Sequence, residues 1–179
     1  MVFEEKTVSS EKIFDGQIIK VRVDTVEMPD GKLATRELVD HPGGVGIVAL
    51  TENNEIIMVK QFRKPIERAI YEVPAGKLDG GEDHYICGVR ELEEETGFKA
   101  KNFEYLGFMY PSPGFANEAT YLYLATELYA GKMNLDPDEY LDVEYIPISK
   151  VKEMIMNNEI NDAKTVFGVF KALELLENV

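Results

Sequence analysis

Residues 76–98 constrain this chain more than any other stretch, because they predict a helix with an unfavourable end. The segment reads GKLDGGEDHYICGVRELEEETGF, and Gly97 is placed to end a helix. Four glutamates fall within residues 91–95, at the negative pole of the helix dipole, where each costs about 0.3–1 kcal/mol. The simple interpretation is a solvated acidic helix end. A local rule broken this heavily also indicates a functional site whose missing partner is a cation.

Three of these glutamates share one face of the predicted helix. Glu91, Glu94 and Glu95 are separated by three and four positions, a spacing that brings helical side chains together. Clustered carboxylates suit Mg²⁺ or Mn²⁺, whereas zinc prefers sulfur and imidazole. The preceding Ala75–Gly76 loop could add a backbone carbonyl to the same ion. A divalent metal beside a glycine-bearing loop indicates phosphate chemistry.

Neighbouring residues are spaced to support the cluster. Arg90 lies four positions before Glu94 and could hold its carboxylate. Glu82 could reach Arg90 only if the loop before the helix folds back. Asp83 is placed to cap the helix, which is expected to run to Thr96. The apolar stripe of the helix is predicted to consist of Tyr85, Ile86, Val89 and Leu92.

The net charge of the chain excludes some classes of partner. The 33 acidic and 19 basic residues give a net charge of −14, which argues against binding to nucleic acid or to an anionic membrane. The single cysteine, Cys87, excludes an internal disulfide and fits a reducing cytoplasm. Residues 1–12 lack the features of a signal peptide, and no apolar run approaches the ~20 residues of a membrane span. We therefore expect a cytoplasmic protein.

The N-terminal part of the chain is predicted to be an antiparallel β-ribbon. Ile19, Val21 and Val23 alternate with polar residues, the period of a half-buried strand. An Asp-Gly turn at residues 29–31 predicts a hairpin. The sequence HPGG at residues 41–44 then marks a boundary, which divides the chain into a ribbon of residues 1–41 and a main domain of residues 42–179.

The main domain is predicted to be an α/β (α+β) sandwich with a mixed sheet. Strands come first along the chain and helices are interspersed among the later ones, which places helices against a sheet. A glycine-bearing loop is expected at residues 76–81, and Ser149 is expected to cap the second helix. Strands are predicted at residues 45–50, 56–62, 69–73, 102–109, 119–126 and 142–146, and helices at 83–96, 149–157 and 162–177.

The whole pattern of the acidic segment resembles the Nudix box of the Nudix hydrolase family. Nine specified positions occur at fixed spacing and all are filled, so chance coincidence is a poor explanation. These positions are Gly76, Glu82, Arg90, Glu91, Leu92, Glu94, Glu95, Gly97 and Phe98. Segments outside the box are similar to the ADP-ribose pyrophosphatase branch of the family: residues 61–65 (QFRKP), 72–77 (EVPAGK), 112–115 (SPGF), and the ribbon with Arg36 and Glu37.

This resemblance implies a Nudix-type α/β/α sandwich that hydrolyses ADP-ribose to AMP and ribose 5-phosphate. It implies Mg²⁺, or Mn²⁺, with room for more than one ion. Two alternatives remain open. One is hydrolysis of another nucleoside diphosphate derivative, such as an ADP-sugar, NADH or a dinucleoside polyphosphate. The other is a sensor that binds ADP-ribose or an NAD derivative without cleaving it.

Carried over residue by residue, the resemblance assigns Glu91 and Glu95 as metal ligands. Glu94 would be a third ligand or would hold the attacking water, and the Ala75 carbonyl would complete the metal shell. Glu82 and Arg90 would support the ligands by holding the loop to the helix.

The general base is predicted on the acidic loop of residues 136–140. In the family branch that this chain resembles, a glutamate of this loop takes or steers the proton of the attacking water. Here the resemblance points to Glu139. Some relatives carry an acid at the position of Pro137, so the base could be another loop acid. A solvated acidic loop is the structural alternative.

Substrate contacts are predicted in two regions. Arg63, just after a strand, is a candidate partner for a substrate phosphate. Arg36 and Glu37 resemble the residues that contact adenine, although as strand residues they could instead form a cross-strand ion pair. In the loop at residues 112–115, Pro113 either marks the ADP-ribose branch or only stiffens a turn. Gly114 and Phe115 follow it, and Phe115 either lines the sugar pocket or plugs the core.

The predicted ribbon also implies a homodimer. A ribbon of this size is too small to be stable alone. In the family that this chain resembles, it packs across a two-fold axis and contributes to the site of the other subunit.

Overall fold

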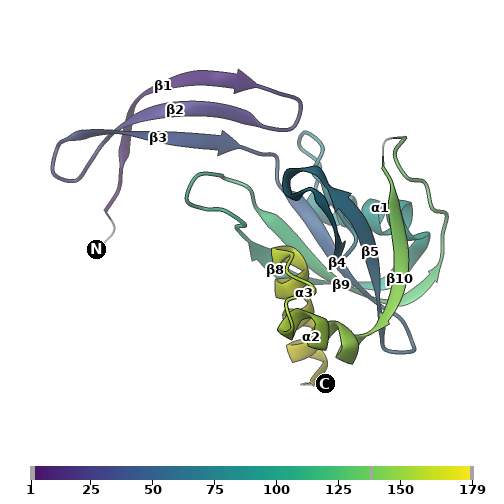
Figure 1. The fold of residues 1–179 in the computed structure, drawn as a ribbon. Coiled ribbons are helices and arrows are strands. Elements are labelled where there is room, and N and C mark those ends of the chain that lie inside the picture. Colours follow the sequence, from purple (N-terminus) through teal and green to yellow (C-terminus); the bar gives the residue numbers. More distant parts are fainter. Residues whose placement is uncertain (1–2, 138, 178–179) are drawn as a thin grey trace. The chain divides into compact units, whose positions relative to one another are not determined.

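The computed structural model describes residues 3–137 and 139–177. The chain forms two compact units, each built around its own sheet (Figure 1). One unit comprises the chain up to Gly43 together with Tyr110–Ala119, and the other comprises Gly44–Met109 and the chain from Thr120 onward.

The first unit contains a three-stranded antiparallel sheet in the order β1-β2-β3. Gly31, with φ of 79°, turns β2 into β3, and its N–H donates to the Met28 carbonyl at 2.8 Å. The predicted Asp-Gly hairpin is therefore confirmed. The strands are β1 (Lys6–Asp15), β2 (Lys20–Glu27) and β3 (Leu33–Asp40).

The loop of residues 110–119 attaches to β3. The Val39 N–H donates to the Phe115 carbonyl at 2.8 Å, and the Asn117 N–H donates to the Val39 carbonyl at 3.2 Å. A proline-containing segment from far along the sequence is thus an ordered part of the ribbon unit.

Strand β1 is exposed along its whole length. Its apolar residues Val8, Ile13 and Phe14 are 56%, 57% and 54% exposed. This strand therefore leaves three large apolar side chains in contact with solvent.

The second unit contains a seven-stranded mixed sheet in the order β10-β5-β4-β9-β8, with β6 paired to β5 and β7 paired to β4. The β4–β9 pair is parallel and the other pairs are antiparallel. The strands are β4 (Gly44–Leu50), β5 (Glu55–Arg63), β6 (Arg68–Glu72), β7 (Ala75–Lys77), β8 (Phe98–Met109), β9 (Thr120–Ala130) and β10 (Leu141–Pro147).

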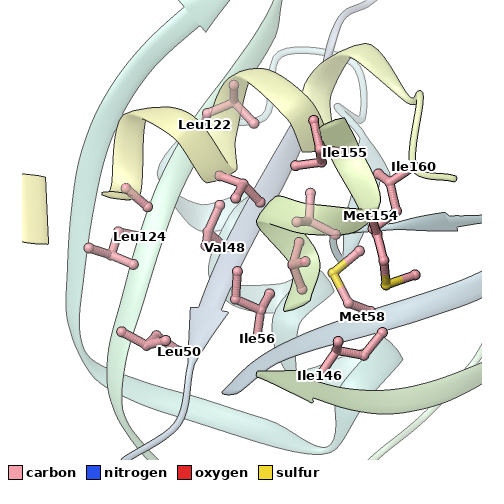
Figure 2. Close-up of a cluster of buried hydrophobic side chains, with 14 of the residues drawn as sticks. Val48, Leu50, Ile56, Met58, Leu122, Leu124, Ile146, Met154, Ile155 and Ile160 are labelled. Atoms are coloured by element: carbon pink, nitrogen blue, oxygen red, sulfur yellow. The ribbon is translucent and has the colours of Figure 1, made fainter. Parts of the chain in front are cut away.

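Helices cover both faces of this sheet, and all seven residues of its central strand β4 are buried. Val48 and Leu50 pack in the core beneath α2 and α3 (Figure 2). Ile47 belongs to the core of the opposite face, with Cys87 and Leu92 of α1. The predicted α/β/α sandwich with a mixed sheet is confirmed. The helices are α1 (His84–Thr96), α2 (Ile148–Met156), α3 (Ala163–Glu177) and the short 3-10 helix η1 (Lys64–Ile66).

The predicted apolar stripe of α1 is partly wrong. Tyr85 and Ile86 are 48% and 59% exposed, although Leu92 is buried as expected. The helix instead buries the small residues Cys87 and Gly88. A Cβ at Gly88 would lie 3.1 Å from the Val45 side chain, so the small residues let α1 approach the sheet closely.

Two local predictions also need correction. Residues 76 and 77 lie in strand β7 rather than in a loop, because Gly76 pairs with Val45 of β4. Helix α2 begins at Ile148, directly after Pro147, and no side chain caps it. The predicted cap Ser149 is therefore inside the helix. Among the described residues, no helix is long and apolar enough to cross a membrane.

The buried thiol of Cys87 gives a test of the α1 packing. Its side chain is fully buried, and burial raises its pKa to about 12. Because the thiolate is the reactive form, we expect negligible modification by a thiol reagent in the folded protein and rapid modification in denaturant. Mass spectrometry of the alkylated protein measures both. Rapid labelling under native conditions would contradict the packing of α1.

Candidate active site

Helix α1 has the ends that the sequence predicts. The Asp83 carboxylate accepts from the Tyr85 N–H at 2.9 Å, so it caps the first turn. Gly97 has φ of 74°, and its N–H donates to the Glu93 carbonyl at 2.8 Å. These caps fix the position of the glutamates relative to the preceding loop.

Arg90 is the centre of an ion-pair network on α1. It donates to Glu82 at 3.1 and 3.2 Å, to Glu91 at 2.8 Å and to Glu94 at 2.9 Å. The Glu82 hydrogen bond, followed by those to the other glutamates, raises the pKa of Arg90 above its usual value. The loop before the helix therefore does fold back, as the spacing of Glu82 requires.

Glu95 is a carboxylate in a costly environment. It is 2% exposed, and the Ala75 N–H donates to it at 2.9 Å. Burial raises its pKa well above the usual value, and the nearby charges of Glu139 and Glu91 raise it further. Only the Ala75 hydrogen bond opposes these effects among the leading causes. A buried carboxylate facing other carboxylates needs a cation to be stable in the ionised form.

Glu91 lies directly against the backbone of β7. A Cβ built at Gly76 would be 1.9 Å from the Glu91 carboxyl carbon and from its Oε1. Glycine at this position is therefore required for the carboxylate to lie here. Burial raises the pKa of Glu91, while Arg90 lowers it.

The acidic loop after β9 joins the same cluster. The Asn134 N–H donates to the Glu94 carbonyl at 2.9 Å, which holds the loop to the end of α1. The half-buried Glu139 lies against Glu95 and close enough to Glu91 for its charge to raise the pKa of both. The structure thus brings the predicted base to the predicted metal ligands. Asp138 of the same loop lies outside the described residues.

The donor set fits a divalent metal ion. Glu91, Glu94, Glu95 and Glu139 supply hard carboxylate oxygens, and Ala75 lies beside them in the backbone. Within residues 3–137 and 139–177, no group of three or more acidic, histidine or cysteine side chains is arranged so that it could hold a metal ion as it stands. In this structure the Glu91 and Glu94 carboxylates instead bind the Arg90 guanidinium.

Arg63 lies near this cluster but is already paired. Its guanidinium donates to both oxygens of Glu72, at 2.6 and 2.8 Å. The charge of Glu95 is among the causes that raise the pKa of Arg63, after the Glu72 hydrogen bonds. The predicted phosphate partner is therefore a half-exposed arginine held by a buried carboxylate.

The remaining predicted contacts belong to the ribbon unit. Arg36 lies opposite Asp24 in the register of β2 and β3 but forms its ion pair with Glu5, at 2.5 Å. Glu37 lies opposite Val23, so neither residue makes the predicted alternative, a cross-strand ion pair.

The loop of residues 112–115 is solvent-facing within the same unit. Pro113 and Gly114 are exposed, and Phe115 is 53% exposed, so the alternative that Phe115 plugs the core is wrong. Pro113 and Phe115 instead line a cavity of about 430 Å³, together with Arg22, Leu38, Val39, Asp40, Tyr110, Ala116 and Asn117.

Sequence reasoning missed the buried carboxylate that holds Arg63. Glu72 is 1% exposed and contacts Lys164 as well as Arg63. One signal could have identified it: an isolated acid at the end of an apolar strand, which needs a partner when buried. Nothing in the local sequence connects it to Lys164, which lies 92 positions away.

Two protein-family models match this chain, and together they cover most of it. The NUDIX domain family matches residues 40–167, and the nucleoside diphosphate sugar hydrolase N-terminal domain matches residues 5–39. The chain belongs to the NUDIX family, as the box predicts. Members of this family generally use divalent metal cations.

Several characterised proteins are similar over most of the chain. An ADP-ribose pyrophosphatase of Bacillus subtilis (strain 168) is 46% identical over 93% of this chain and 91% of its own. A methanol dehydrogenase activator of Bacillus methanolicus is 46% identical over 94% and 92%. An ADP-ribose pyrophosphatase of Mycobacterium tuberculosis is 37% identical over 92% and 81%.

A solved structure supports the fold. The crystal structure of an ADP compounds hydrolase superposes with a TM-score of 0.87 and covers 98% of this chain and 95% of that chain, at 21% sequence identity. At this identity the likeness bears on the arrangement of elements alone.

Proposed function

We propose that the protein is a Mg²⁺-dependent pyrophosphatase that hydrolyses ADP-ribose to AMP and ribose 5-phosphate. The observation that carries the proposal is Glu95, a buried carboxylate that faces Glu91 and Glu139 beside the Ala75 backbone. A cation and a diphosphate complete such a set chemically. Two relatives that are similar over most of the chain are ADP-ribose pyrophosphatases, and they support the choice of substrate.

We assign metal binding to a set of carboxylates and one backbone carbonyl. Glu91, Glu94, Glu95 and the Ala75 carbonyl would hold the metal, and with Glu139 they offer enough oxygens for more than one ion. Bound Mg²⁺, or Mn²⁺, supplies neutralisation of the diphosphate oxygens and a water of lowered pKa.

Proton transfer and substrate orientation fall to residues beside these ligands. Glu139 lies against Glu95, a proposed metal ligand, and so would be beside a water that the metal holds. It takes the proton of this attacking water. Arg63 orients a phosphate through its charge. Arg90 and Glu82 keep the carboxylates and the loop in place before the substrate binds.

The ribbon unit would recognise the rest of the substrate and join two subunits. Arg36, Glu37 and the loop of Pro113, Gly114 and Phe115 would contact the nucleoside and sugar. The exposed apolar residues of β1 support a homodimer in which the ribbon of residues 1–41 packs against a second copy. Sedimentation equilibrium of the purified protein tests this, and a monomer at micromolar concentration would contradict it.

A substrate panel tests the activity. The protein is incubated with Mg²⁺ and, separately, ADP-ribose, an ADP-sugar, NADH and a dinucleoside polyphosphate, and AMP release is measured by chromatography. We expect the highest kcat/KM with ADP-ribose and no requirement for a dehydrogenase, which matters because one relative is named as a dehydrogenase activator. Binding without turnover of any compound would favour the sensor alternative.

Substitution of the proposed base gives a kinetic prediction. Glu139→Gln removes the proton acceptor but keeps the size of the side chain, so we expect kcat to fall by about 100-fold or more while KM changes little. Steady-state kinetics with ADP-ribose and Mg²⁺ measure both constants. An unchanged kcat would assign the base to another acid of the loop.

A further inference from the structure

The network around Glu72 links the start of α3 to the strand that leads into the active site. Glu72 ends β6, and both of its carboxylate oxygens accept from Arg63. Lys164, in the first turn of α3, binds the oxygen Oε2 that also accepts from the Arg63 Nη2. One buried carboxylate is therefore shared by two cations from distant parts of the chain.

Lys164 contributes strongly to the stability of the ionised Glu72. Burial raises the pKa of Glu72, but the Arg63 hydrogen bonds and the charge of Lys164 together lower it below the usual value. Lys164 is only 16% exposed and has a second carboxylate, Asp162, at 3.1 Å. The ammonium group is thus fixed in place and is not a mobile surface charge.

The helix start is anchored independently of Lys164. The Asp162 carboxylate accepts from the Thr165 N–H at 3.0 Å, and the Thr165 hydroxyl accepts from the Val73 N–H at 2.9 Å. These bonds hold α3 to the segment after Glu72 whether or not residue 164 carries a charge. A role for the charge of Lys164 can therefore be separated from a role in attaching the helix.

This arrangement bears on how Arg63 can bind substrate. A bidentate pair between arginine and a buried carboxylate is strong, and a buried carboxylate left without a cation is strongly destabilising. If Arg63 were the only cation at Glu72, it could not turn toward a substrate phosphate without leaving that charge unpaired. With Lys164 in place, the carboxylate keeps a partner when Arg63 leaves.

We propose that Lys164 is a positioning residue that shares Glu72 with Arg63 and thereby frees the arginine to bind the substrate diphosphate. The inference rests on the proposed function, in which Arg63 contacts a phosphate. Lys164 itself need not touch the substrate, since its ammonium group stays on Glu72 and Asp162.

Lys164→Met tests the proposal by removing the charge and keeping the length of the side chain. We expect kcat/KM for ADP-ribose to fall by about tenfold, mainly through a higher KM, because Arg63 stays on Glu72. Lys164→Arg is expected to restore most of the loss. Lys171→Met removes a lysine from the exposed face of the same helix and is expected to change kcat/KM by less than about twofold.

Two combined variants distinguish this role from a structural one. Glu72→Gln combined with Lys164→Met removes the carboxylate that traps Arg63, so kcat/KM should recover relative to Lys164→Met alone. In a background of Arg63→Ala with Glu72→Gln, which leaves no buried carboxylate unpaired, Lys164→Met should have no further effect on kcat/KM. Additive losses in both combined variants would overturn the proposal, because a purely structural lysine would act regardless of Arg63 and Glu72.

A measurement without turnover separates this inference from the proposed function. The ¹⁵N relaxation of the Arg63 Nε–H group, recorded with Mg²⁺ and a non-hydrolysable ADP-ribose analogue, reports whether the guanidinium leaves Glu72. We expect a changed Arg63 signal in the wild type and an unchanged one in Lys164→Met. An equal change of the Arg63 signal in the two proteins would overturn the role of Lys164. No change in either protein would instead overturn the proposed function, because the analogue then does not engage Arg63.

Discussion

Glu95→Gln is expected to abolish hydrolysis while it makes the metal-free protein more stable. The substitution keeps the shape of a side chain that is 2% exposed but removes its charge, which lies near the charges of Glu91 and Glu139. A proposed metal ligand is lost, so kcat should fall by at least about 100-fold, the upper range for residues that only support a ligand. Removal of an unpaired buried charge should raise the free energy of unfolding of the metal-free protein.

Thermal unfolding measures the second half of this expectation. For a chain of this size, a gain of about 1 kcal/mol raises Tm by about 2–4 °C. The wild type should gain Tm when Mg²⁺ is added, since the ion binds only the folded state, and Glu95→Gln should gain much less.

Glu93→Gln is the matched control for Glu95→Gln. It makes the same chemical change on the same helix, but Glu93 pairs with Lys99 at 3.1 Å, outside the acidic cluster. We expect kcat to change by less than about twofold. Equal losses in the two variants would mean that helix charge in general, and not a metal ligand, accounts for the effect.

The sequence predicts the core of the fold well because its strands bury apolar residues. Strand β4 is apolar along its length and lies where the sequence places it. The strands β8 and β9 are longer than predicted, since their outer ends pair with each other at Phe98 and Ala130. At this end of β8, Phe98 and Ala100 pack on the core and alternate with Lys99 and Lys101, but this alternation is short and directly follows the end of a helix, so it predicts no strand by itself.

In the candidate site, contacts between residues close in sequence could be predicted, and contacts between distant residues could not. Residues within the box are related by helical spacing, so the contact of Arg90 with Glu94 follows from the sequence, whereas its contact with the adjacent Glu91 does not. Contacts that depend on the tertiary fold, such as Lys164 with Glu72, follow from no local pattern. The face of α1 was misjudged for a related reason: small residues, and not the large apolar ones, determine how closely the helix approaches the sheet.

Gly76→Ala is expected to remove activity with little effect on stability. The added Cβ would lie 1.9 Å from the Glu91 carboxyl carbon, so the carboxylate has to leave its place. The displaced atoms are the far end of a flexible side chain, and Gly76 has no positive φ that alanine would strain. The fold can therefore adapt cheaply, and the smaller entropy of the unfolded chain offsets part of the cost by about 0.4–1 kcal/mol.

Gly76→Ala should therefore lose activity while the protein stays folded. Displacement of a proposed metal ligand should lower kcat by about 100-fold and reduce the gain in Tm that Mg²⁺ gives to the wild type. Gly80→Ala is the matched control, because an added Cβ there meets nothing within 4 Å and its φ is not positive. If Gly76→Ala kept both its activity and its response to Mg²⁺, the Glu91 carboxylate would not need its place against β7, and its assignment as a ligand would fail.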